Sequence, residues 1–273
     1  ILREASHDVR VWHMPFVAQE QPSWQRFLRH LEDRKPRKEV VKEILEWQPT
    51  LLLTHNLTGC GFGTPSLIQA HGVRWIHVLH DVQLFEPSGQ MYSALDITVW
   101  QLFWGWLRSR SLGHPHMVIS PTAWLLRKHR RRGFFLSDQV LCRVLPNPGD
   151  PLRLGERPIH HPRRLLYVGR VAVDKGSVFL ERLMRELPPS YELHVVGEGM
   201  GAKALGQMPS VYLHGRLSRP EIKQLMDTSD VLLVPSLIEE NQPTVILEAA
   251  SCGLPVIASD KGGIPETMGR GGI

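Results

Sequence analysis

Short apolar runs that alternate with helix-like stretches are the feature that most constrains the fold of this 273-residue chain. Each run is only a few residues long, as expected of a strand that is buried in a sheet. Strands that alternate with helices favour a parallel sheet covered on both faces. In the first half the predicted strands are 8–12, 50–55, 75–80, 117–120 and 140–145, and the predicted helices are 38–47, 65–71 and 122–132.

A proline-rich break separates two such alternations. It begins with Pro146-Asn-Pro-Gly-Asp-Pro and continues through Pro158 to Pro162, a composition typical of a linker. We therefore predict one domain over residues 1–155 and a second over residues 156–273. In the second the predicted strands are 164–169, 192–196, 211–214, 231–234 and 256–258, and the predicted helices are 176–187, 220–228 and 244–251. Two doubly wound domains that face each other place a cleft at the carboxyl ends of both sheets.

Two carboxylates eight positions apart, Glu240 and Glu248, mark the most informative segment for function. Glu240 ends a polar loop after an apolar strand, and Glu248 lies in an apolar stretch that reads as a helix from about Pro243. Eight residues are just over two turns of a helix, so both carboxylates can face one cleft. The free N–H groups at the start of that helix suit an anion. Together these features predict a site for a sugar joined to a phosphate.

The surrounding residues resemble a known family. The Leu247-Glu-Ala run, the strand that follows Cys252-Gly and the Gly262-Gly-Ile-Pro-Glu266 turn accompany the two carboxylates. The whole segment resembles the Glu-x7-Glu region of retaining, nucleotide-sugar-dependent glycosyltransferases of family 4. This resemblance implies an α/β fold of two Rossmann-like, doubly wound domains facing a cleft (GT-B). We expect both domains to be incomplete: the first lacks its opening strand and glycine-rich loop, and the second lacks its last elements and final helix.

Roles for individual residues follow from this resemblance. Glu240 is expected at the hydroxyls of the donor sugar and Glu248 at the ribose of the nucleotide. The residues that would line the donor's phosphates and sugar are Gln242, Pro243, Thr244 and Val245. Gly197 would form a tight turn beside the nucleotide, and Leu217 would lie against the base.

Two cations follow the first strand of the second half. Arg170 comes directly after Gly169, and Lys175 opens the next helix. Arg can hold a diphosphate through a forked pair of bonds and Lys as a point charge. Their order resembles the donor-phosphate grip of the same family. With two cations and a helix N-terminus aimed at the leaving group, and no Asp-x-Asp motif in the sequence, we predict no metal and no other cofactor.

His80 ends a predicted strand and is followed by Asp81, a pair that resembles the family's His-Asp pair facing the donor sugar. We expect His80 to bind a sugar hydroxyl and to support developing positive charge through its backbone carbonyl. His77 and His80 also have the HxxH spacing of some metal sites. Positions three apart on a strand face opposite sides, and no further ligand is evident, so no metal site is predicted.

Residues 97–134 combine aromatic and basic side chains. The aromatic and large apolar residues that gather here are Trp100, Leu102, Phe103, Trp104, Trp106 and Leu107, and the basic residues nearby are Arg108, Arg110, Arg127, Lys128 and Arg130–Arg132. Residues 1–155 carry 19 Lys and Arg against 13 Asp and Glu, whereas residues 156–273 carry 13 against 14. This pattern suits an anionic membrane surface, although a half-buried helix beside a solvated basic helix explains it equally well. No nucleic-acid recognition module is seen.

The predicted function is transfer of a hexose-type sugar from a UDP- or GDP-sugar to a glycan or lipid-linked acceptor, with retained configuration, in cell-envelope synthesis. A sugar-nucleotide epimerase on the same fold and a non-catalytic nucleotide-sugar-binding module remain alternatives. Three distant cysteines with no CxxC pair favour a cytoplasmic setting, where the protein is expected to be soluble or peripheral on the membrane.

Overall fold

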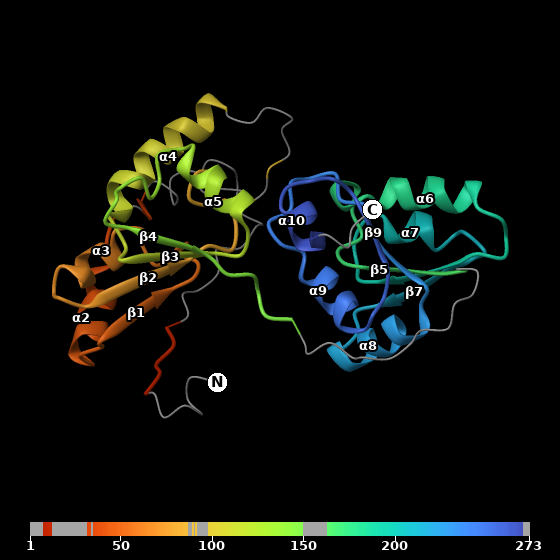
Figure 1. Ribbon diagram of the computed structural model, residues 1–273, viewed down its shortest axis with the longest axis horizontal. Helices are drawn as coiled ribbons and strands as arrows, with labels where there is room; N and C mark the ends of the chain where they lie inside the picture. The colour runs from red at the N-terminus through yellow and green to blue at the C-terminus, as the bar shows by residue number, and fades with distance from the viewer. Residues whose placement is uncertain are drawn as a thin grey trace.

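The computed structural model describes residues 8–12, 32–33, 35–86, 89, 91, 98–149 and 163–269. These residues form two lobes that lie side by side, each built around a parallel sheet (Figure 1). The predicted domain boundary at residue 155, with Pro158 and Pro162, lies outside the described residues.

The first lobe is a four-stranded sheet in the order β1-β2-β3-β4. All three strand pairs are parallel, as the alternation of strands and helices predicts. The strands are β1 (Leu51–Thr54), β2 (Arg74–Val78), β3 (Met117–Ser120) and β4 (Leu141–Val144), and the helices are α2 (Lys38–Glu46), α3 (Thr64–Gln69), α4 (Val99–Leu112) and α5 (Ala123–Arg130).

The core of the first lobe is aromatic. Trp75 on β2 is fully buried and packs in one cluster with Phe85, Leu125 of α5 and Phe134. A second cluster joins Val41 and Ile44 of α2 to Ile68 of α3. The sheet is thus held between two apolar layers, and its strand ends are left to form loops.

The second lobe is a five-stranded parallel sheet in the order β7-β6-β5-β8-β9. The order reverses beside β5, which is the topology of a doubly wound sheet. The strands are β5 (Arg164–Val168), β6 (Glu192–Val196), β7 (Val211–Gly215), β8 (Val231–Val234) and β9 (Val256–Ala258). The helices are the 3-10 helix η1 (Val173–Lys175), α6 (Ser177–Glu186), α7 (Ala202–Leu205), α8 (Arg219–Thr228), α9 (Thr244–Ser251) and α10 (Ile264–Met268).

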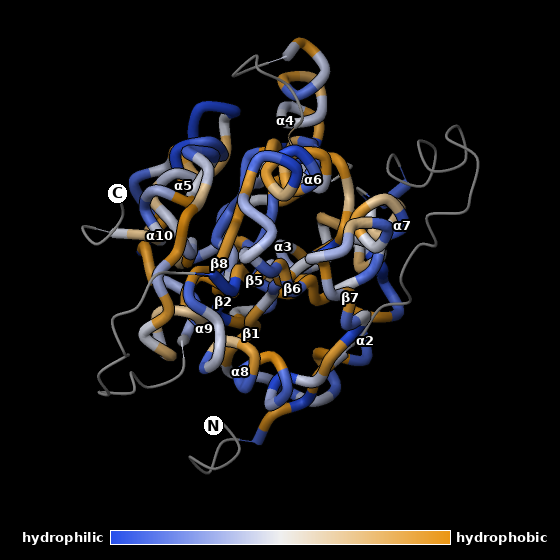
Figure 2. Tube along the Cα trace, turned by 90° about the vertical axis from the view of Figure 1, so that its right-hand side faces the viewer, coloured by the Kyte–Doolittle hydropathy of each residue, from blue (hydrophilic) through white to orange (hydrophobic). Residues whose placement is uncertain are grey.

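Each face of this sheet has its own core. Leu180 of α6 and Leu205 of α7 pack with Leu193 on one face, whereas Met226 of α8 and Ile246 of α9 pack with Leu166 on the other. Figure 2 shows the hydrophobic stretches gathered in the central strands. Because helices cover both faces, the prediction of an α/β, doubly wound architecture is confirmed.

The structure differs from the sequence prediction in several places, one of which is α4, since the sequence offers a half-buried helix within residues 97–134 only as an alternative. Residues 8–12 do not form the predicted strand; Trp12 instead packs on Trp47 and donates to Glu43 of α2 at 2.8 Å. Helices α7 and α10 are not predicted because they are too short to show a helical period. Other predicted ends, such as those of α5, shift by one or two residues, which is the usual uncertainty of helix boundaries. Within the described residues, no helix combines the length and apolar character needed to cross a bilayer.

Candidate functional site

The loop between β8 and α9 brings Glu240 against Lys175. The Glu240 carboxylate accepts a bond from Lys175 Nζ at 2.5 Å and a second from Ser236 Oγ at 2.6 Å. The Lys175 and Glu240 side chains are only 23% and 17% exposed, so this ion pair is largely removed from solvent. Two residues that the sequence assigns to adjoining parts of a donor molecule, the diphosphate and the sugar, therefore contact each other here.

Arg170 has a carboxylate partner as well. It pairs with Asp174 of η1, and Tyr167 Oη donates to the Arg170 carbonyl at 2.7 Å. Burial, with the Glu240 carboxylate nearby, raises the pKa of Tyr167 well above its usual range. The site therefore holds a neutral phenol and two cation–carboxylate pairs at the carboxyl end of β5.

Glycines let the loops of this site approach closely. Gly197 follows β6 with φ +126°, and a Cβ there would lie 1.9 Å from the Gly169 carbonyl oxygen. Gly176 has φ +87°, and a Cβ there would lie 2.2 Å from the Pro235 carbonyl oxygen. Side chains at these positions would push apart the loops that carry Arg170, Lys175 and Glu240. The predicted tight turn at Gly197 thus has a steric cause.

Helix α9 presents its N-terminus to the same region. It begins at Thr244 after Pro243, and no side chain caps it. N–H groups in its first turn, at Thr244 and Val245, therefore remain suited to an anion. Glu248 lies one turn further along and is half-buried. The predicted phosphate-binding and ribose-binding residues thus follow one another on a single helix.

Two predicted site residues have structural partners of their own. Gln242 accepts a bond from the Asn147 backbone N–H at 2.7 Å, which ties the loop before α9 to the chain after β4. Leu217 packs against the apolar cluster beneath α8 and α9.

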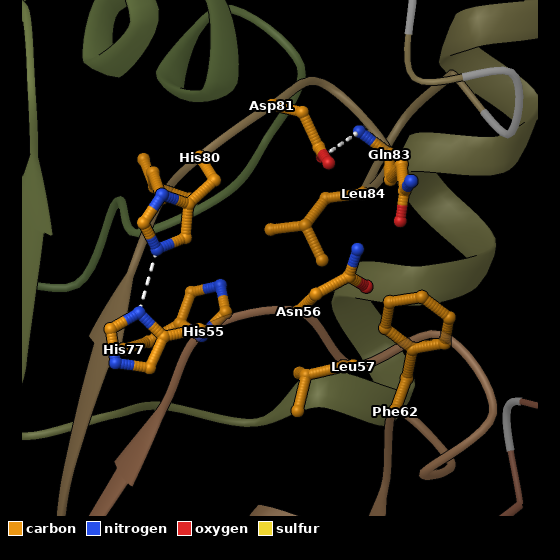
Figure 3. A pocket seen from close by; sticks show the side chains of 10 residues that line it. His55, Asn56, Leu57, Phe62, His77, His80, Asp81, Gln83 and Leu84 are labelled. Atoms are coloured by element: carbon orange, nitrogen blue, oxygen red, sulfur yellow. Dashed lines mark hydrogen bonds between the residues drawn. The ribbon is translucent and has the colours of Figure 1, made fainter. Parts of the chain in front are cut away.

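The first lobe contributes a small cavity at the ends of β1 and β2 (Figure 3). His80, His55, Asn56 and Gln83 line it together with the apolar side chains of Leu57, Phe62, Leu79 and Leu84. The His55 and His80 rings meet edge to edge at an interplanar angle of 23°, and His55 Nδ1 lies 2.6 Å from His80 Nε2. His55 is not among the residues singled out from the sequence.

His77 lines the same cavity as His80, which corrects the sequence argument that they face opposite sides. Strand β2 ends at Val78, so the alternation of faces no longer applies at His80. His77 is buried, Thr54 Oγ1 lies 2.8 Å from its Nδ1, and burial lowers its pKa to about 3. Across the part of the chain that the structure describes, no group of three or more His, Cys, Asp or Glu could hold a metal ion.

Buried charges hold the two loops that form this cavity. The Asp33 carboxylate accepts bonds from Gly59 N at 2.8 Å and Gly61 N at 3.0 Å, and its burial raises its pKa. Arg108 is 1% exposed and donates to the Gln83 carbonyl, and burial lowers its pKa to about 10. Thr58 Oγ1 joins the loops by donating to Gln83 Oε1 at 2.6 Å.

Hydrogen bonds cross from one lobe to the other at the site. Asn241 Nδ2 donates to the His80 carbonyl at 3.0 Å, and Thr122 Oγ1 donates to the Asn241 carbonyl at 3.2 Å. The Glu266 carboxylate accepts from the Ala123 and Trp124 backbone N–H groups at 2.5 and 3.0 Å. The carboxyl ends of both sheets thus meet, and Asn241 is a residue of this site that the sequence patterns do not reveal.

Comparison with known proteins agrees with this geometry. Residues 162–273, which include the second lobe, match the model of the family described as glycosyl transferases group 1. The sulfoquinovosyl transferase SQD2 of Arabidopsis thaliana is 34% identical over 138 residues, 49% of this chain and 24% of the relative. The amylovoran biosynthesis glycosyltransferase AmsK of Erwinia amylovora is 34% identical over 125 residues, 40% of this chain and 31% of the relative. The chain thus spans only about a quarter to a third of these relatives.

Solved structures extend the likeness to both lobes. Anabaena Alr3699/HepE in complex with UDP has a TM-score of 0.67 at 19% identity, covering 88% of this chain and 70% of that one. The sucrose-phosphate synthase of Thermosynechococcus elongatus has a TM-score of 0.64 at 20% identity, covering 86% of this chain and 64% of that one. At such identity the likeness establishes the fold, which is that of GT-B glycosyltransferases.

Proposed function

We propose that the protein transfers a hexose-type sugar from a UDP- or GDP-sugar to an acceptor hydroxyl, with retention of configuration. The observation that carries the proposal is the Lys175–Glu240 pair beside the uncapped N-terminus of α9. A cation and free N–H groups suit a diphosphate, and a carboxylate suits sugar hydroxyls. Both lie in the domain that matches glycosyl transferases group 1.

In the proposed reaction the bond from the anomeric carbon to the diphosphate oxygen breaks while a bond to the acceptor oxygen forms on the same face. The leaving diphosphate gains negative charge and takes the acceptor's proton. Arg170, Lys175 and the N-terminus of α9 would stabilise that charge more in the transition state than in the ground state. No protein nucleophile and no metal is part of this proposal.

His80 would bind a sugar hydroxyl from the first lobe. Its backbone carbonyl already accepts a bond from Asn241, but a carbonyl oxygen has a second lone pair. That lone pair would face positive charge developing at the anomeric carbon. The contact between the lobes would therefore hold this carbonyl near the donor sugar while leaving one of its lone pairs free to accept.

A lipid-linked or cell-envelope acceptor is proposed from the outer face of α4. Trp100, Leu102, Phe103 and Trp106 are 42–53% exposed, and Arg110 lies over the Trp106 ring at 4.7 Å. Exposed aromatic side chains beside cations suit the interface of an anionic bilayer. Association with the cytoplasmic face of a membrane would bring the transferase to such an acceptor.

Calorimetric titration with UDP, GDP and ADP, without divalent metal, tests the donor site. We expect UDP or GDP to bind and Lys175→Ala to weaken that binding at least tenfold. Lys42→Ala, which removes an exposed lysine paired with Glu46 on α2, is the control and should change nothing. Failure of all three nucleotides to bind would overturn the proposal.

Incubation with UDP- or GDP-hexoses then separates the candidate functions. Release of free nucleoside diphosphate together with transferred or hydrolysed sugar supports a transferase. An epimerised donor would point to the epimerase, and binding without turnover to a binding module.

A further inference from the structure

The paired rings of His55 and His80 carry an inference that rests on the proposed function and extends it. They come from loops after neighbouring parallel strands, 25 residues apart in the sequence, and their centroids are 4.9 Å apart at an interplanar angle of 23°. A separation of 2.6 Å between His55 Nδ1 and His80 Nε2 requires a proton between the two nitrogens. Figure 3 shows this bond at the edge of the cavity.

The surroundings favour the uncharged form of both rings, because they lower both pKa values. Partial burial lowers the pKa of His55 and of His80, and each ring lies close to the other. His77 lies behind them and is also neutral, since burial lowers its pKa to about 3. Asp81, the acidic residue that lines the cavity, accepts a bond from the Gln83 N–H, and burial raises its pKa.

Two neutral imidazoles that share one proton have complementary tautomers. If His55 donates from Nδ1, then His80 carries its own proton on Nδ1; if His80 donates from Nε2, its Nδ1 is a bare acceptor. The position of the shared proton therefore decides whether His80 Nδ1 donates a hydrogen bond to a ligand or accepts one. It also holds the His80 ring in one orientation.

We propose that His55 is a positioning residue that fixes the tautomer and orientation of His80 toward a hydroxyl of the sugar substrate. The adjoining cavity supports this choice of ligand, because its volume of about 20 Å³ suits one water or one hydroxyl group. A phosphate group is too large for it. Its polar side chains can form hydrogen bonds to a hydroxyl group, and its apolar side chains can contact the carbon that carries the hydroxyl.

Nuclear magnetic resonance of the ¹⁵N-labelled imidazoles tests the pairing without any substrate. In His55→Phe we expect the ¹H–¹⁵N pattern of His80 to change to that of a ring free to exchange between tautomers. His55→Asn places an amide group near the position of Nδ1, where its nitrogen can donate to His80 Nε2 or its oxygen can accept from it, and should keep the wild-type pattern. His71→Phe, at an exposed histidine just after α3, should change nothing. An unchanged His80 pattern in His55→Phe would overturn the inference.

The rate at which the protein turns over the sugar donor tests whether His55 matters for function. His55→Phe should lower kcat about tenfold with an unchanged KM for the donor, the size expected for one lost hydrogen bond, and His55→Asn should recover to within about threefold of wild type. Because His55 is exposed, these variants should fold, and His55→Ala replaces His55→Phe if the larger ring is not accommodated.

The two hypotheses fail separately. If UDP or GDP binds in the Lys175-dependent manner but His55→Phe turns over like wild type, the role of His55 is wrong and the proposed function stands. If no nucleotide binds, the proposed function fails, and the resonance experiment still decides whether His55 fixes His80.

Discussion

The two predicted donor-binding cations are each paired with a carboxylate of the same lobe. Lys175 bonds to Glu240, and Arg170 bonds to Asp174. A diphosphate that enters the site must replace these carboxylates as the partner of each cation. The affinity for a nucleotide therefore depends on how much more strongly each cation binds the diphosphate than its carboxylate. Removing a competing carboxylate should raise that affinity.

Asp174→Asn tests this competition. Arg170 is 48% exposed, and an exposed ion pair contributes about 0.2–1 kcal/mol. We therefore expect UDP or GDP to bind about two- to fivefold more tightly to the variant, measured by calorimetry. Glu186→Gln, which breaks the exposed Arg182–Glu186 pair on α6, is the matched control. Weaker binding in Asp174→Asn would show that Asp174 orients Arg170 for the phosphate instead of competing with it.

The sequence identifies some site residues and not others for a physical reason. Lys175 precedes α6, Glu240 lies in the loop after β8 and Glu248 lies within α9, and local patterns of strands and helices reveal all three positions. His55 is a single histidine after β1, and its partner His80 lies on another strand end. Their contact depends on the register that pairs Thr54 with His77, and register between parallel strands cannot be read from either strand alone.

At the scale of elements, α5 shows how the lobes share a helix terminus. The Thr122 side chain accepts from the Leu125 N–H at 3.2 Å, and Glu266 of α10 accepts from the two preceding N–H groups. The first turn of α5 is thus capped partly by its own chain and partly by the other lobe. A negative carboxylate also suits the positive end of the helix dipole.

The same scale shows what sequence patterns reveal about the fold. The predicted limits of α9 and β9 agree with the structure, because Pro243 and Cys252-Gly-Leu-Pro bound apolar runs with clear breaks. Residues 8–12 also alternate apolar and polar side chains, yet Trp12 packs on α2. Tertiary packing decides such short segments, so their local pattern is a weak guide.

The exposed face of α4 gives a prediction at this scale. Figures 1 and 2 both place α4 at the upper edge of the molecule, and Figure 1 shows it on the outer side of the first lobe. We expect the protein to bind vesicles of phosphatidylcholine and phosphatidylserine at low salt. The double variant Phe103→Ser/Trp106→Ser should weaken this binding at least tenfold, because each ring contributes roughly 1.5–3 kcal/mol when it is buried. Tyr212→Ser removes an aromatic ring that is 45% exposed on β7 and is the control. Equal cosedimentation of all three proteins would exclude α4 as the contact.

For the whole molecule, buried histidines predict loss of stability in acid. Burial lowers the pKa of His77 to about 3 and that of His129 to about 4. Unfolding returns each to about 6.5, so between pH 6.5 and 4 the unfolded chain binds more protons than the folded one, and stability falls as pH falls. Each histidine should contribute a slope of about 1.4 kcal/mol per pH unit within this window.

Tryptophan fluorescence during urea unfolding measures this slope for the first lobe, because all eight tryptophans precede residue 150. His129→Leu should lower proton uptake at pH 5 by about one proton, whatever its effect on stability at pH 7. His71→Asn, at an exposed ring, should leave the slope as it is. A slope that does not change in His129→Leu would contradict a neutral, buried His129.

The contacts between the lobes predict which step of the reaction depends on them. The residues assigned to the donor nucleotide all lie in the second lobe, whereas His80 lies in the first and is held by Asn241. Asn241→Ala/Glu266→Ala removes three hydrogen bonds between the lobes, each contributing about 0.5–1.5 kcal/mol. We expect UDP or GDP affinity to stay within about twofold of wild type while turnover falls at least tenfold.

Small-angle scattering should show a larger radius of gyration for this double variant, because the lobes are then less firmly joined. Glu46→Ala/Glu186→Ala, which removes two exposed carboxylates from α2 and α6, controls for loss of charge. If nucleotide affinity fell in parallel with turnover, the first lobe would itself contact the nucleotide. If turnover did not change, His80 would reach the sugar without Asn241, and the bonds that join the lobes would have no part in catalysis.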